Sequence, residues 1–252
     1  MRFVIFASKL SGVVGCNPFQ SMEQVALDIL KTDHSETYIE ALNRNSLIEV
    51  SPESLLGSSA PSEPLPQPTI NDLITNTDAN PSQVEEFATR ESSGNIRVAG
   101  EIKSYIFRER GTRNEAANMS KLNIEYTKPN DTYKLKLKFS EDEVFLYGKV
   151  DGIAVDSDGQ KYVIESKNRQ YKLFNTVRDY ERIQCIAYMK LLNVSKCLLV
   201  EHYNDTYSTQ WIHLSNTEWH DIIIGINTFI IYFKRLLSDT ALQDQLVIKY
   251  KS

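Results

Sequence analysis

The stretch of residues 147–167, YGKVDGIAVDSDGQKYVIESK, constrains the fold more than any other part of the chain, because its pattern predicts a β-hairpin. Small and apolar residues dominate its first half up to Val155, and the apolar triplet 162–164 leads directly into its last three residues. Between these runs lies the polar segment 156–159, which ends in glycine, as is typical of a tight turn. We therefore expect two antiparallel strands joined at this segment.

Three charged side chains would meet if this hairpin forms. Asp151 stands near the end of the first apolar run, and Glu165 and Lys167 stand two apart on the second strand. Alternate residues of a strand project from the same face, so Glu165 and Lys167 point the same way. Pairing of the strands can bring Asp151 close to them, which would place two carboxylates and one ammonium around a single point.

Such a group of side chains is suited to holding a divalent metal and activating a water molecule. Carboxylate oxygens favour Mg²⁺ or Mn²⁺, the backbone carbonyl of Ser166 is placed to add a ligand, and Lys167 would orient or deprotonate the water. A surface hairpin with an incidental ion pair is the alternative. Charges at the ends of buried strands, however, require a reason.

The order of the expected elements predicts an α/β fold, in which helices flank a central mixed β-sheet. Apolar periodicity predicts helices over residues 9–14, 21–30, 36–44, 98–123 with a possible break at Gly111, 176–192 and 215–237. Alternation and β-branched content predict strands over residues 124–127, 133–139, 144–155, 160–166, 196–203 and 208–214.

We expect one domain over residues 1–252, built from three parts. Residues 1–50 form an N-terminal helical part, and residues 96–252 hold the hairpin and most of the regular pattern. Residues 51–95 contain six of the eight prolines and few large apolar residues, so they are expected to form an irregular inserted loop.

Charge is distributed unevenly along the chain, whose net charge is −5. Residues 1–96 carry 5 basic and 13 acidic side chains, whereas residues 97–190 carry 18 basic and 14 acidic ones. The part that holds the hairpin is thus the basic part. A basic cleft suited to nucleic acid and a mixed solvated surface both agree with this distribution.

The cysteine content indicates a reducing compartment, so we expect an intracellular protein. The three cysteines are scattered, which argues against a disulfide framework and is too few for a four-cysteine cluster. The N-terminal apolar run is shorter than a secretory signal requires. Residues 222–233 are apolar but too few to span a bilayer, so a buried helix is expected there instead of a membrane contact.

Four segments, in this order, resemble the PD-(D/E)XK nuclease superfamily, in particular its lambda-exonuclease and YqaJ-like viral recombinase branch, which overlaps the RecB-type nucleases. They are FASKLSGVVGCNPF at residues 6–19, RGTRNE at 110–115, the hairpin at 147–167 and QCIAY at 184–188. Two departures are visible. Val150 stands where the superfamily name has proline, and the insert separates the first two segments.

The resemblance implies a restriction-endonuclease-like core and a set of metal ligands. Glu115, Asp151 and Glu165 would bind Mg²⁺ or Mn²⁺ with help from the Ser166 carbonyl, and Lys167 would position or activate the water. An ordinary exposed helical acid is the alternative for Glu115.

The resemblance also implies DNA contacts. Gln184 and Tyr188, four apart on one helix face, would touch the DNA strand and hold the site's geometry. Ser8 would bind a terminal phosphate, and Arg110 and Arg113 would add contacts to the backbone. Core packing for Tyr188 and a helix N-cap for Ser8 are the structural alternatives.

In function, the resemblance implies a magnesium-dependent deoxyribonuclease, most simply an exonuclease that acts on duplex ends in recombination or repair. Its partners would be double-stranded DNA ends, a single-strand annealing protein or recombinase, and further copies of the chain. A viral relative would be nuclear or virus-associated. The alternatives are a sequence- or structure-specific endonuclease of the same fold, a non-catalytic module that binds DNA or a recombinase, and an enzyme that acts on RNA.

Overall fold

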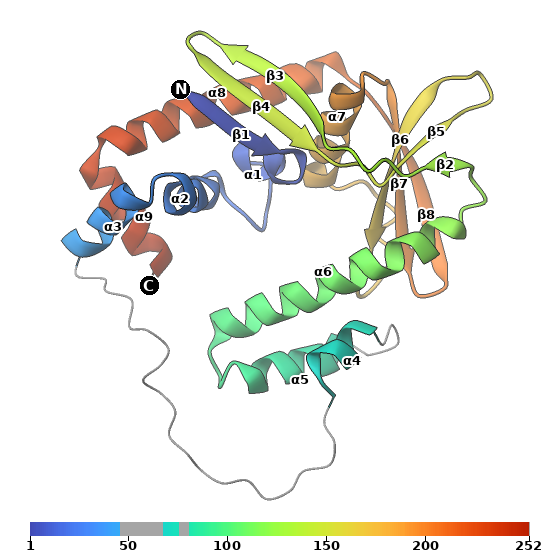
Figure 1. Ribbon diagram of the computed structural model, residues 1–252, viewed down its shortest axis with the longest axis horizontal. Coiled ribbons are helices and arrows are strands. Elements are labelled where there is room, and N and C mark those ends of the chain that lie inside the picture. Colours follow the sequence, from blue (N-terminus) through green and yellow to red (C-terminus); the bar gives the residue numbers. More distant parts are fainter. Residues whose placement is uncertain (46–67, 76–80, 252) are drawn as a thin grey trace, which may run out of the picture.

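The computed structural model describes residues 1–45, 68–75 and 81–251, and shows two mixed β-sheets with helices packed around them (Figure 1). The smaller sheet has the order β1-β4-β3, from Arg2–Phe6, Asp142–Gly148 and Tyr133–Phe139, with β1 parallel to β4. The larger has the order β2-β5-β6-β7-β8, from Tyr126–Thr127, Gly152–Val155, Lys161–Asn168, Lys196–Tyr203 and Thr206–His213. The predicted fold class, a mixed α/β protein with flanking helices, is confirmed.

The predicted hairpin is present as β5 and β6. Gly152 pairs with Ile164 and Val155 with Lys161 in antiparallel register. In the turn, Asp156 Oδ1 accepts hydrogen bonds from two backbone N–H groups, and Gly159 takes a positive φ of 76° that a side chain would disfavour.

The prediction of one continuous strand over residues 144–155 is wrong. The chain leaves β4 at Gly148, crosses between the sheets at residues 149–151 and re-enters regular structure at Gly152. At Gly148 the chain meets helix α7 (Asp179–Leu192), because a Cβ there would lie 2.7 Å from Tyr188 Cε1. The crossing leaves Asp151 between the two sheets, beside the first residues of β5.

A β-α-β unit forms the centre of the larger sheet. Strands β6 and β7 are parallel neighbours, and helix α7 (Asp179–Leu192) connects them. The helix begins three residues later than predicted, and it ends where predicted, with Asn193 in the left-handed region at φ 54°. Its inner face carries both core side chains and polar ones, and the polar ones form the site described below.

Helices from both ends of the chain cover the main core. They are the 3-10 turn η1 (Ala7–Lys9), α1 (Leu10–Val13), α2 (Met22–Asp33), α3 (Ser35–Arg44), α8 (Asn216–Ser238) and α9 (Thr240–Lys251). A capping box between Ser21 and Gln24 starts α2. The apolar run at residues 222–233 lies within α8, where Phe233 packs edge-on against Phe3 of β1. Helix α9 was not predicted, since its apolar residues follow no clear helical stripe.

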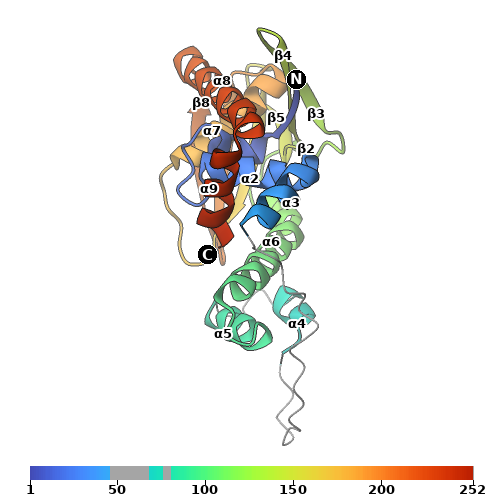
Figure 2. The same cartoon turned by 90° about the vertical axis from the view of Figure 1, so that its left-hand side faces the viewer.

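The expectation of an irregular insert is wrong for the described part of that segment. Helix α4 (Ile70–Thr75) and helix α5 (Pro81–Glu91) pack on α6 (Ile96–Ser120) around a small separate core. Its buried members are Leu73, Ile74, Val84, Phe87 and Ile106. Residues 46–67 and 76–80 lie outside the described residues. Helix α6 is unbroken at Gly111, and Figure 2 shows it projecting from the sheets with α4 and α5 beside its outer end.

The other end of α6 covers the second face of the larger sheet. Met119 and Leu122 pack there on Ile164, Leu198 and Val200. Strands β6 and β7 are therefore buried on both faces, by α7 on one and by α6 on the other. Among the described residues, no helix is long and apolar enough to cross a membrane. The three cysteines are free.

Candidate active site

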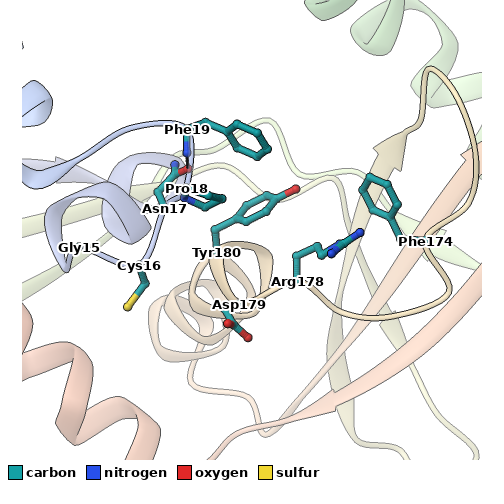
Figure 3. A pocket seen from close by; sticks show the side chains of 9 residues that line it. All are labelled: Gly15, Cys16, Asn17, Pro18, Phe19, Phe174, Arg178, Asp179 and Tyr180. Atoms are coloured by element: carbon teal, nitrogen blue, oxygen red, sulfur yellow. Dashed lines mark hydrogen bonds between the residues drawn. The ribbon is translucent and has the colours of Figure 1, made fainter.

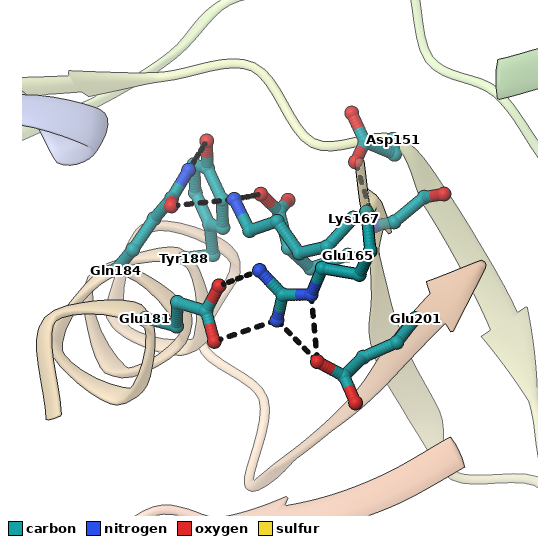
Figure 4. A network of polar contacts seen from close by, with 9 residues as sticks. Asp151, Glu165, Lys167, Glu181, Gln184, Tyr188 and Glu201 are labelled. Carbon is teal, nitrogen blue, oxygen red and sulfur yellow. Dashed lines mark hydrogen bonds and ion pairs between the residues drawn. The ribbon is translucent and has the colours of Figure 1, made fainter. Parts of the chain in front are cut away.

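Two rows of polar side chains face each other between β6 and α7 (Figure 4). Residues 165, 167 and 169 alternate along β6 and so share one face of the sheet. Residues 181, 184 and 188 are spaced three and four apart on α7, which places them on one face of the helix. The rows interdigitate, so that Lys167 meets Gln184 and Arg169 meets Glu181.

Glu165 and Lys167 form the centre of this arrangement. Lys167 Nζ donates to Glu165 Oε1 at 2.7 Å and to Gln184 Oε1 at 2.9 Å. Glu165 is only 3% exposed, and its other oxygen, Oε2, is buried with no hydrogen-bond partner among the described residues. A buried carboxylate oxygen without a partner is costly, and a bound cation would remove that cost.

Asp151 reaches the same region from the crossing between the sheets. Its Oδ2 accepts a hydrogen bond of 2.8 Å from the backbone N–H of Ser166. Burial, and then the nearby charges of Glu165 and Glu115, raise the pKa of Asp151 to about 8, although the Ser166 N–H and Lys167 oppose this. Two carboxylates thus crowd a buried space that contains one ammonium group.

Lys167 keeps its proton in this environment. Burial works against its charge, but the Glu165 carboxylate outweighs burial and holds the pKa of Lys167 above its usual range. The ammonium is therefore a hydrogen-bond donor and a positive charge. Of the two roles predicted for Lys167, this charge state favours orienting the water over deprotonating it.

Gln184 and Tyr188 hold Lys167 in place. Gln184 Nε2 donates to the Tyr188 hydroxyl oxygen at 2.9 Å, which orients the amide so that its oxygen faces the ammonium. Tyr188 is buried, and its ring packs over Gly148, where any larger residue would collide with it. Burial raises the pKa of the Tyr188 hydroxyl, so it stays neutral. The position of Tyr188 favours the predicted geometric role over contact with a DNA strand.

Glu115 lies on α6, and its closest partner is a lysine that the motif did not include. Lys128 Nζ pairs with Glu115 Oε1 at 2.7 Å. That hydrogen bond, together with the charges of Glu115 and Asp151, raises the pKa of Lys128. Lys128 follows β2 directly, but no spacing rule connects it with the hairpin, so sequence reasoning missed it.

The carboxylates fit a hard divalent cation in part. Asp151 and Glu165 offer oxygens in a crowded, buried region, and Glu165 Oε2 has no partner there. Among the described residues, however, no group of three or more His, Cys, Asp and Glu side chains is arranged to hold a metal ion. The predicted third carboxylate, Glu115, is instead paired with Lys128.

The remaining members of the two rows, Arg169 on β6 and Glu181 on α7, form a second buried network. The Arg169 guanidinium pairs with Glu181 at 2.6 and 3.0 Å, and its Nε donates to Glu201 Oε1 at 2.7 Å. The other Glu201 oxygen accepts from the backbone N–H of Asn175 at 2.9 Å. Glu201 interrupts the apolar run of β7, which was a sequence signal for this network. The network connects β6, β7 and the start of α7, two residues along β6 from Lys167.

The remaining predicted DNA contacts lie on other parts of the surface or interior. Arg110 is 4% exposed, and its Nε donates to the Leu73 carbonyl at 2.5 Å, so it anchors α4 on α6 and its position does not support a DNA contact. Arg113 is exposed. Ser8 is exposed in η1 and does not cap a helix, and it lines an open pocket with Lys9 and Lys31.

No protein-family model matches the chain. No curated protein sequence matches it either. Among solved structures, the chain resembles the alkaline exonuclease LHK-Exo from Laribacter hongkongensis at 13% identity and a TM-score of 0.41, over 67% of this chain and 87% of that one. It resembles the protein SSO0001 at 14% identity and a TM-score of 0.42, over 79% and 85% of the two chains. For a phage-related exonuclease from Haemophilus somnus the values are 14% identity, a TM-score of 0.39, and 69% and 89%.

Proposed function

We propose that this protein is a metal-dependent nuclease that hydrolyses phosphodiester bonds of DNA. One observation carries the proposal. Asp151, Glu165 and Lys167 converge beside the end of β6, and Glu165 keeps a buried oxygen without a partner among the described residues. The open end of a parallel β-α-β unit is also where ligands commonly bind in α/β proteins.

Each residue of the site has a distinct part in this proposal. Asp151 and Glu165 would hold Mg²⁺ or Mn²⁺, with the Ser166 carbonyl and, after release from Lys128, Glu115 as further ligands. The bound metal would supply charge stabilisation at the phosphate and an activated water. Lys167 places its ammonium beside the phosphate, where it offsets developing negative charge. Gln184 and Tyr188 keep that ammonium in position.

The finer parts of the proposal come from the ordered motifs. The enzyme would be an exonuclease that acts on double-stranded ends in recombination or repair, alongside a single-strand annealing protein or recombinase. Ser8 and Arg113 would contact phosphates, and several copies of the chain would assemble on DNA. Contacts with phosphates dominate such binding, so activity should fall steeply as salt increases.

The test is cleavage of a linear DNA duplex in the presence of Mg²⁺. We expect Asp151→Asn and Lys167→Met to lower the cleavage rate by at least about 100-fold, since each removes a charged group from the site. Asp158→Asn and Lys161→Met are matched controls, because they change exposed side chains of the same hairpin. Equal rates for wild type and site variants, or no cleavage by wild type, would overturn the proposal.

Closed circular DNA separates the two nuclease types. An exonuclease leaves the circle intact and degrades it only after it has been linearised. Opening of the intact circle, lost in Asp151→Asn, would instead establish an endonuclease at the same site. Binding of DNA without cleavage of any substrate, RNA included, would favour a non-catalytic module.

A further inference from the structure

We propose that the pocket at the N-terminal end of α7 is a stacking subsite for one unpaired base of the DNA strand. This inference rests on the proposed nuclease function and adds a specific contact to it. The pocket lies between the loop 15–19 and the segment 174–180, and has a volume of about 510 Å³ (Figure 3). Pockets of this size are typical of small-ligand sites and can hold a nucleotide.

Three aromatic side chains, Phe19, Phe174 and Tyr180, line the pocket. Phe19 is 78% exposed, and its ring meets Tyr180 edge-on at 5.7 Å with an interplanar angle of 81°. Figure 3 shows these two rings beside each other, with Phe174 apart from them on the other side of Arg178. A nucleobase stacks on such rings whatever its identity, because every base has a π face.

A positively charged side chain, Arg178, lies next to the aromatic rings. The Arg178 guanidinium lies 4.3 Å from the centre of the Phe174 ring, and no carboxylate among the described residues pairs with it. The neighbouring acid, Asp179, points away from Tyr180 and from the rings (Figure 3). Arg178 is thus available for the phosphate of a nucleotide whose base occupies the pocket.

Two residues that line the pocket, Tyr180 and Phe174, lie next to residues of the polar rows described above. Tyr180 and Gln184 are four residues apart on α7, which is about one helical turn, or about 6 Å along the helix axis. Gln184 binds Lys167, so Tyr180 lies one helical turn from the residue that accepts a hydrogen bond from the ammonium. On the other side, Phe174 lies between Arg178 and Arg169, whose guanidinium is also 4.3 Å from the ring. A strand with a phosphate at Lys167 can therefore place an adjacent base in the pocket.

An unpaired base suits this arrangement, because both of its faces are free to stack. Inside a duplex, both faces of a base are covered by its neighbours, so an internal base can stack on Phe19 or Tyr180 only after it has left the stack. Such bases exist at frayed ends and in single strands. The subsite would thus favour DNA with an unpaired end next to the scissile phosphate.

The test measures binding without cleavage. Fluorescence anisotropy in EDTA follows a labelled single-stranded oligo(dA) and the same oligonucleotide with abasic sites, with wild type and Phe19→Leu. We expect Phe19→Leu to weaken binding of oligo(dA) by about five-fold or more and to leave the abasic oligonucleotide unaffected. Tyr171→Leu is the matched control, because Tyr171 is 68% exposed and lies outside the pocket.

A second variant tests the phosphate contact. Arg178→Gln should weaken binding of the base-containing and abasic oligonucleotides by the same factor, and should reduce the salt dependence of both. The inference is overturned if Phe19→Leu leaves oligo(dA) binding unchanged, or weakens both oligonucleotides equally.

The same protein preparations distinguish this outcome from failure of the proposed function. Cleavage of linear duplex by wild type but not by Asp151→Asn, with no base-dependent effect of Phe19→Leu, removes the subsite and keeps the nuclease. Base-dependent binding without any cleavage keeps the subsite and removes the nuclease. Absence of both removes both.

Discussion

At the scale of single residues, the electrostatics of Asp151 and Lys167 determine what the site can do. Both are partly enclosed, and both are influenced by Glu165, but in opposite directions. Glu165 stabilises the ammonium of Lys167 and destabilises the carboxylate of Asp151. In the absence of a cation, the site therefore cannot stabilise both carboxylates as anions at neutral pH, and Asp151 keeps its proton there.

This crowding predicts a pH-dependent cost in stability. The pKa of Asp151 is about 8 in the folded protein, against about 3.9 for an unfolded Asp. Between these values the folded state holds a proton that the unfolded state has released, so the free energy of unfolding falls as the pH rises from about 4 to 8. Asp151→Asn lacks this loss, and should be more stable than wild type at pH 8 by on the order of 2–4 kcal/mol.

Urea denaturation at pH 5 and pH 8 in EDTA measures this difference. Asp158→Asn serves as the control, because its carboxylate is exposed and should leave the pH dependence of wild type unchanged. The same slope with pH for wild type and Asp151→Asn would contradict the electrostatic account of the site.

At the scale of elements, the packing of α7 on β6 brings the side chains of the site together. The Arg169 network joins three elements next to that site. Arg169 connects β6 with Glu181 of α7 and with Glu201 of β7, and all three side chains are nearly removed from solvent. A buried charge network of this kind contributes specificity of packing more than net stability, but removing one member leaves the others uncompensated.

We predict that Arg169→Met lowers the free energy of unfolding by about 3–5 kcal/mol, because two buried carboxylates lose their cation. Chemical denaturation near neutral pH measures this change. Arg235→Met is the control, since Arg235 is exposed and pairs with Asp239 at the end of α8, where a surface ion pair contributes at most about 1 kcal/mol. A similar small effect of both substitutions would show that the Arg169 network does not hold α7 on the sheet.

At the scale of the whole molecule, the helices α4 and α5 pack mainly on α6, although the first turn of α5 also lines a pocket with Gln170, Tyr171 and Tyr203. Their small core is separate from the main one, and it has Ile106 fully buried at its centre. The opposite end of α6 carries Glu115 and then packs on the larger sheet. Local opening of the α4–α5 unit should therefore be possible without unfolding of the sheets.

Ile106→Ala tests this independence. Loss of the buried side chain should destabilise the small core by about 2–5 kcal/mol. Hydrogen exchange should then accelerate in residues 81–91 and remain unchanged in β7. Ile231→Ala is the matched control, because Ile231 is exposed on α8 and its truncation should change neither region. Equal acceleration in α5 and β7 would show that the chain unfolds as one unit.

Much of the regular structure, and the central part of the site, followed from local patterns in the sequence. The alternation that defines β6 puts Glu165, Lys167 and also Arg169 on one face, and the 3.6-residue period of α7 puts Gln184 and Tyr188 on another. The polar turn that ends in Gly159 joins β5 to β6 as antiparallel neighbours, as expected. These features depend on backbone geometry alone, so a single sequence contains enough information to predict them.

Only the tertiary structure decided what the face of β6 and the face of α7 pack against. The division of residues 144–155 between two sheets depends on the contact of Gly148 with Tyr188, which comes from a helix about 40 residues away. The pairing of Glu115 with Lys128, the burial of Arg110 against Leu73 and the folding of α4 and α5 likewise involve partners with no fixed spacing in the sequence. By itself, the sequence determined which side chains share a face of a strand or helix. Which faces meet, and which charges are left without partners, was decided by long-range packing, because burial and charge pairing depend on neighbours that local periodicity cannot specify.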